Sequence, residues 1–136
     1  MSYNSLREKI AAEKQERAER HAGYKALYEL AMREGYRAGE LATPRTMYVQ
    51  DTATGQVWAE SEGMCGFAWV VVKNANKGFG HWLIKTGLAR KGYQGGAHIW
   101  ISAHNQSIER KTEHAIAVAQ VLRNAGVDAY ADSRLD

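Results

Sequence analysis

The sequence predicts an α+β fold in which helices pack on one face of a small mixed β-sheet and an N-terminal helix protrudes. Three observations predict this class. Residues 5–34 are rich in helix-forming side chains. Two alternating runs, 46–51 and 56–61, flank a glycine-containing turn in the manner of a β-hairpin. From residue 65 onward the patterns follow the order β-α-β-α-β, so the sheet is expected to hold the hairpin and this unit.

The first element is a helix whose beginning is a charged arm. Residues 1–23 carry oppositely charged side chains four positions apart, such as Glu13–Arg17 and Glu16–Arg20, and have almost no apolar stripe. This composition predicts a solvated helical arm. Leu6 and Ile10 favour the alternative, an oligomerisation helix, although a heptad would place Glu13 and Arg17 in its seam.

The second half of this helix begins the single α+β domain predicted for residues 24–136. Ala31, Gly35 and Gly39 recur every four residues, a spacing of small side chains that allows another backbone to approach closely. Pro44 then ends the helix, because proline cannot continue it.

The middle of the chain predicts one buried strand and one short helix. The run CGFAWVVVK, from Cys65, is nearly continuous in apolar residues and is typical of a buried strand, with Cys65 as a buried, inert thiol. A short helix is expected over 77–86, with Gly87 as its end, and a loop over 88–96. Four aromatic residues of this region are expected in the core: Phe67, Trp69, Phe79 and Trp82.

The last third of the chain gives the clearest pattern. Residues 97–102 alternate, so that His98, Trp100 and Ser102 share one face of a strand. Ser107 is a good N-cap for a helix that ends near Gly126, and VDAYA after it predicts a final strand.

Composition places the chain among soluble, single-domain proteins. It has 136 residues, 45% of them hydrophobic, with a formal net charge of +3 and one cysteine, which excludes an internal disulfide framework. We find no leader pattern and no apolar run near the roughly 18 residues that span a bilayer. A cytoplasmic location without membrane contact is therefore expected.

One segment, 63–107, contains no carboxylate and carries all the candidate ligand-binding residues. Its cations, glycine-rich loop and exposed rings predict a surface that attracts an anion and stacks on a base. His104 precedes the last helix and is the best single histidine for a ligand contact. The candidate ligand-binding residues are Lys73, Lys77, Lys85, Arg90, Lys91, Tyr93, Trp100 and His104.

Metal and catalytic motifs are not found in the sequence. No two histidines have the H-x-x-x-H or H-E-x-x-H spacing of a helical metal site, and no local motif marks a nucleophile with its base. No metal, cofactor or catalytic residue is expected on this basis.

Several short blocks in order also resemble a known group of proteins. GYRAGELATP, SEGMCGFAWV, ARKGYQGG, IWIS, NQSIERK and VLRNAGVDAYADSRLD resemble, over about residues 24–136, a widespread set of small proteins encoded by tailed bacteriophages. No function is known for that family, so it supplies no site residue. The resemblance implies expression in the cytoplasm of an infected bacterium and an accessory or host-directed role.

Three hypotheses follow. The first is a non-enzymatic accessory protein that binds a phosphate-bearing ligand, either single-stranded nucleic acid or a small nucleotide, through the basic glycine-rich segment. The second is a protein–protein module, a host-directed inhibitor or assembly factor that binds a host protein or forms homo-oligomers through the N-terminal helix. The third is a small nuclease or phosphodiesterase that uses His104 with Asp128 or Asp132.

Overall fold

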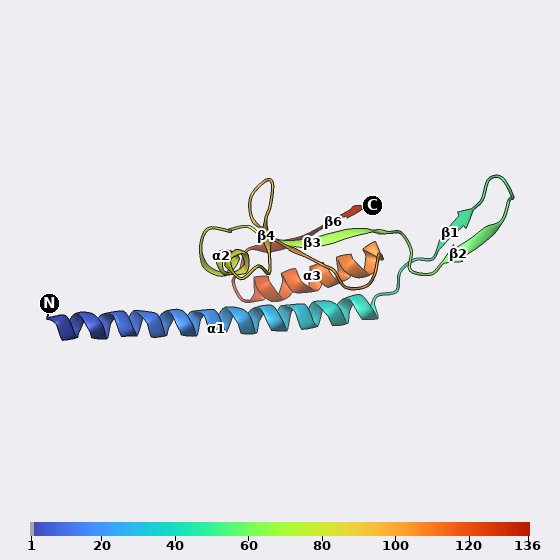
Figure 1. Cartoon of the computed structure of the whole chain (residues 1–136). Helices are drawn as coiled ribbons and strands as arrows, with labels where there is room; N and C mark the ends of the chain where they lie inside the picture. Colours follow the sequence, from blue (N-terminus) through green and yellow to red (C-terminus); the bar gives the residue numbers. More distant parts are fainter. Residues whose placement is uncertain (1) are drawn as a thin grey trace.

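The structure, a computed structural model, describes residues 2–136 and confirms the α+β class. Three helices and six strands follow one another along the chain (Figure 1). In order they are α1 (Tyr3–Leu41), β1 (Met47–Gln50), β2 (Val57–Glu60), β3 (Gly66–Val72), α2 (Gly78–Lys85), β4 (Arg90–Lys91), β5 (Ala97–Trp100), α3 (Ile108–Asn124) and β6 (Ala129–Leu135).

The strands form two separate sheets, and both are antiparallel rather than mixed. β1 and β2 make a hairpin of their own, while the larger sheet has the order β4-β5-β3-β6. No parallel pair forms because β5 runs antiparallel between β3 and β4, so these two strands, which run in the same direction on either side of α2, are not neighbours.

The larger sheet has the connectivity of ferredoxin-like folds. From β3 onward the order is β-α-β-β-α-β, with β3 and β5 in the centre of the sheet and β4 and β6 at its edges. The sequence predicted a loop over 88–96; within it, β4 pairs Arg90 with His98 and Lys91 with Ala97. This short edge strand completes the sheet.

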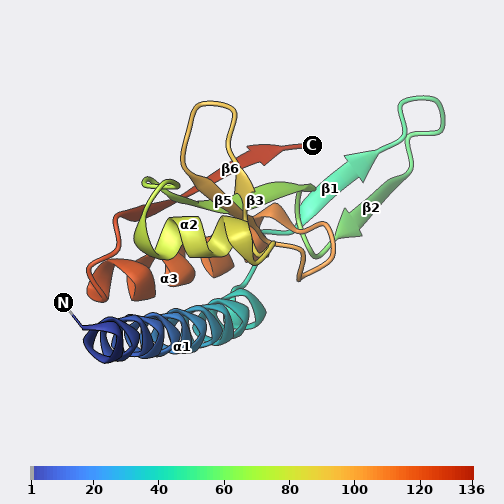
Figure 2. The same ribbon diagram turned by 60° about the vertical axis from the view of Figure 1, so that its left-hand side comes forward.

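The core lies between the sheet and its helices, which cover one face only (Figure 2). Alternate residues of β3, among them Val70 and Val72, point to that side and are at most 2% exposed. Leu83 of α2 and Leu122 of α3 are completely buried and belong to the same apolar cluster. Ser107 caps α3 by accepting a hydrogen bond from the backbone N–H of Arg110, as predicted.

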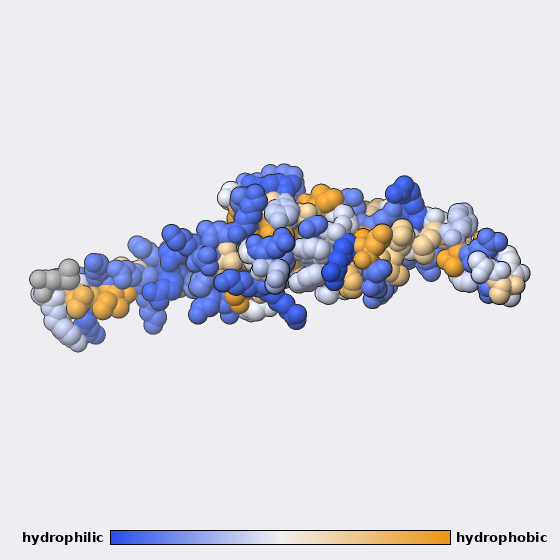
Figure 3. Space-filling view, turned by 90° about the horizontal axis from the view of Figure 1, so that it is seen from above, coloured by the Kyte–Doolittle hydropathy of each residue, from blue (hydrophilic) through white to orange (hydrophobic). Residues whose placement is uncertain are grey.

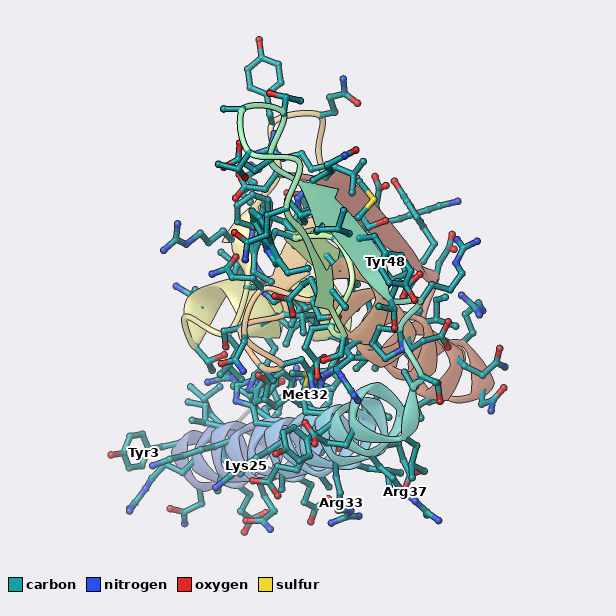
Figure 4. The ribbon with its side chains drawn as sticks, turned by 90° about the vertical axis from the view of Figure 1, so that its right-hand side faces the viewer. Tyr3, Lys25, Met32, Arg33, Arg37 and Tyr48 are labelled. Atoms are coloured by element: carbon teal, nitrogen blue, oxygen red, sulfur yellow. The ribbon has the colours of Figure 1, made fainter. Side chains whose placement is uncertain are left out.

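Helix α1 forms a further layer beneath α3 and extends beyond it (Figures 1 and 3). Its first 21 described positions, 3–23, are exposed, and burial begins at Tyr24. Figure 4 shows Met32 directed towards the rest of the molecule, whereas Arg33 and Arg37 point away from it. No helix in residues 2–136 is both long and apolar enough to span a bilayer.

Two protruding elements therefore lie at opposite ends of the body. The N-terminal arm is mostly hydrophilic with an apolar patch near its tip, where Leu6 and Ile10 are exposed (Figure 3). The β1–β2 hairpin leaves the other end. Arg110 secures its root by donating hydrogen bonds to the carbonyls of Gly39 and Glu40 and pairing with Glu62 at 2.6 Å.

Candidate functional site

The face of the larger sheet opposite the helices is uncovered, and only the β4–β5 loop rises above it (Figures 1 and 2). Strand alternation places on this face the residues whose neighbours in sequence point into the core. We call it the open sheet face. Its residues are Phe67, Trp69, Val71, Arg90, His98, Trp100, Tyr130, Asp132 and Arg134, of which Val71 is buried.

Aromatic rings occupy the centre of the open sheet face. Trp69 of β3 lies directly opposite Trp100 of β5, and their ring centroids are 4.7 Å apart. Phe67 meets Trp100 edge to face at 6.4 Å, and His98 stacks on Trp69 at 6.3 Å. Trp100 remains 42% exposed and Tyr130 43% exposed, so flat ring surface is available to a ligand.

Charged groups surround these rings but nearly balance. The Arg134 guanidinium lies 5.5 Å from the Phe67 ring centroid, and the Lys73 ammonium lies 5.8 Å from that of Tyr130. Asp128 pairs with Lys73 at 3.7 Å. With Arg90 and Asp132 included, three cations and two carboxylates border the rings, a net of +1, so stacking rather than charge distinguishes this surface.

The structure does not gather the predicted cations into one surface, and that expectation is wrong. Lys73 and Arg90 border the open sheet face, but alternation along β4 points Lys91 to the other side. Lys77 and Lys85 stand at the two ends of α2, on the helix side of the sheet. The reason is geometric, because a helix and an edge strand within one segment carry its side chains to different sides.

Among the predicted rings, Trp100 lies on the open sheet face, and Tyr93, fully exposed, lies on the β4–β5 loop beside it. Of the four aromatic residues expected in the core, Phe79 is buried there and Trp82 packs against it. Phe67 and Trp69 instead lie partly exposed on the open sheet face. The period-two pattern of β3 could have predicted this position for Phe67 and Trp69, because they alternate with Gly66, Ala68 and Val70. Tyr130 and Arg134 required the pairing of β6 with β3, which no local pattern gives.

His104 is half-buried with its side chain enclosed, so it does not present its ring to a ligand as predicted. Its side chain has no exposed surface; Nδ1 lies 2.9 Å from Glu40 Oε1, and Nε2 lies 2.9 Å from His114 Nδ1. A carboxylate accepts hydrogen bonds, so His104 Nδ1 carries a proton in this arrangement. These contacts join Glu40 of α1 to His114 of α3 through His104, and Gly39 leaves room for the His104 ring, which a Cβ at that position would meet.

His114 ends this chain as a buried group with an unmet hydrogen bond. Its Nε2 has no partner among residues 2–136, and the residue is 2% exposed. Burial, and next the charge on His104, lower the pKa of His114 to about 4. It is therefore neutral at pH 7.

Cys65 also departs from its predicted environment. It is exposed rather than buried, since it precedes β3 and lies outside the regular pairing of the sheet, with an isolated bridge to Ser107. Within residues 2–136, no three histidine, cysteine or carboxylate side chains come together in a way that could hold a metal ion.

Comparison of the chain with protein-family models, with curated proteins and with solved structures finds no match. Any functional proposal for it therefore rests on its own geometry.

Proposed function

We propose that the protein binds single-stranded nucleic acid on the open sheet face without catalysing a reaction. The observation that carries the proposal is the set of rings on β3 and β5, the two central strands, with Trp69 and Trp100 side by side and partly exposed. Stacking of a base on an aromatic side chain contributes about 1–3 kcal/mol and is available to every base. Four-stranded sheets of RNA-recognition motifs bind unpaired bases through such rings.

The arrangement of the rings favours a nucleic-acid strand over a single nucleotide as the ligand. Phe67 and Trp69 are two residues apart on β3, a separation of about 7 Å along the strand, and Trp100 stands beside them on β5. Such a row can receive successive bases. Duplex DNA or RNA keeps its bases stacked within the helix, so an unpaired strand is the form that fits.

The nuclease hypothesis loses its predicted residues in this fold. His104 is enclosed between α1 and α3, whereas Asp132 stands on the open sheet face, on the other side of the sheet. Asp128 pairs with Lys73 near the end of β3. We therefore favour binding over cleavage. The resemblance to phage proteins suggests an accessory role in an infected cell as the setting, and this stays a prediction.

Trp100→Ala tests the proposal. Loss of one stacked base should weaken binding of a fluorescein-labelled oligothymidylate by about 5- to 150-fold, measured by fluorescence anisotropy. Tyr48→Ala is the matched control, because Tyr48 is 73% exposed on the separate hairpin (Figure 4) and should not affect binding. No binding by the parent protein, or equal affinities for the two variants, would reject the proposal.

A further inference from the structure

A cleft between α1 and α2 combines cations and rings without any acid. It encloses about 360 Å³ and lies on the helix side of the sheet, away from the open sheet face. Its lining contains only basic, aromatic and glycine residues: Arg17, Arg20, His21, Tyr24, Gly78, His81, Trp82 and Lys85. We call it the α1–α2 cleft.

The two arginines of the cleft make no close ion pair with a carboxylate in the part of the chain that the structure describes. The sequence predicted ion pairs Glu13–Arg17 and Glu16–Arg20 along the arm, but neither forms within 4.0 Å in the described chain. Lys85, the last residue of α2, also makes no ion pair within this distance among residues 2–136. Arg17, Arg20 and Lys85 therefore border one concave surface without a close carboxylate partner within the described residues.

Packed aromatic rings fix the relative positions of these cations. Tyr24 of α1 lies 5.7 Å from Phe79 and 5.9 Å from Trp82 of α2, measured between ring centroids. Phe79 is 6% exposed and part of the core. Because the rings hold the two helices together, the cations on either side are presented at a defined separation rather than on a free arm.

We infer that the α1–α2 cleft binds phosphate groups of the same nucleic-acid strand whose bases stack on the open sheet face. This inference rests on the proposed function. Arginine suits phosphate because its planar guanidinium can donate two parallel hydrogen bonds to phosphate oxygens. Lys85 belongs to α2, which contacts β4, the edge strand that carries Arg90, so a nucleic-acid strand that leaves the open sheet face over this edge would run towards the cleft.

Affinity for the nucleic-acid strand should then come from two separate surfaces. The open sheet face has a net charge of only +1 and binds bases, whereas the cleft has three acid-free cations and binds the backbone. The salt dependence of binding should therefore arise mainly in the cleft. For single strands, each neutralised phosphate contributes about −0.7 to the slope of log K against log salt concentration.

The double variant Arg17→Gln/Arg20→Gln tests the cleft. Its affinity for a long oligothymidylate at low salt should fall about tenfold, and its salt slope should become shallower by about 1.4. Arg33→Gln/Arg37→Gln is the control, because it removes the same charge from the side of α1 that faces away from the body (Figure 4). A tetranucleotide, which covers only the open sheet face, should bind all three proteins equally.

Equal salt slopes for the two double variants would overturn the inference. So would a loss of tetranucleotide affinity in Arg17→Gln/Arg20→Gln as large as its loss of affinity for the long oligothymidylate. If only the role of the cleft is wrong, the parent protein still binds both oligonucleotides and Trp100→Ala still weakens that binding. Failure of the proposed function is different, because the parent protein would then bind neither oligonucleotide.

Discussion

Gly35→Ala should destabilise the protein by about 1–3 kcal/mol, although alanine is the better helix former. Gly35 lies where α1 packs on α3 and is buried. A Cβ at this position would overlap Cδ2 of the His114 ring and lie 2.6 Å from Cγ2 of Val118. Both neighbours are buried in the core layer, so neither can move without displacing others.

Gly23→Ala is the matched control for this prediction. Gly23 is in the same helix, but a Cβ there would meet nothing within 4 Å. Its substitution should be neutral or stabilising by up to about 1 kcal/mol, because only the helix propensity changes. Urea unfolding of the two variants measures the difference. If both are equally stable, α1 does not pack closely on α3 in solution.

The elements themselves could be predicted because their signals are local. Ser107 as N-cap, Gly87 after α2 and the alternation in 97–100 each depend on a few neighbouring residues, and the structure has them as expected. The recurrence of Ala31, Gly35 and Gly39 indicated a close approach by another backbone. It could not indicate that the side chains in contact would be His104 and His114.

The candidate site was harder to predict because it depends on pairing between distant strands. The acid-free segment is continuous in sequence, but Asp128 returns beside Lys73 and Asp132 comes to lie opposite Trp69 through the pairing of β6 with β3. The α1–α2 cleft likewise joins Arg17 to Lys85 across 68 positions of sequence. A charged segment can be recognised from the sequence, but which charges share a surface depends on the tertiary structure.

The second large effect is expected in acid. Below pH 6.5 an unfolded chain protonates its histidines, but folded His114, with its pKa lowered to about 4, stays neutral. The unfolded state therefore binds more protons between pH 6.5 and 4, and stability falls as the pH falls through this window. Between pH 7 and pH 4.5 this residue should account for a loss of about 2 kcal/mol in the free energy of unfolding.

His114→Leu should remove this part of the acid sensitivity, and urea unfolding at the two pH values measures it. The variant loses the hydrogen bond to His104 and starts from a lower stability at pH 7, so the quantity to compare is the change between pH values. His81→Leu, which removes an exposed imidazole on α2, should keep the parent's full loss. If His114→Leu loses as much stability between pH 7 and pH 4.5 as the parent, His114 is not the source of the acid sensitivity. Its removal would then have left the difference in bound protons between the folded and unfolded states unchanged.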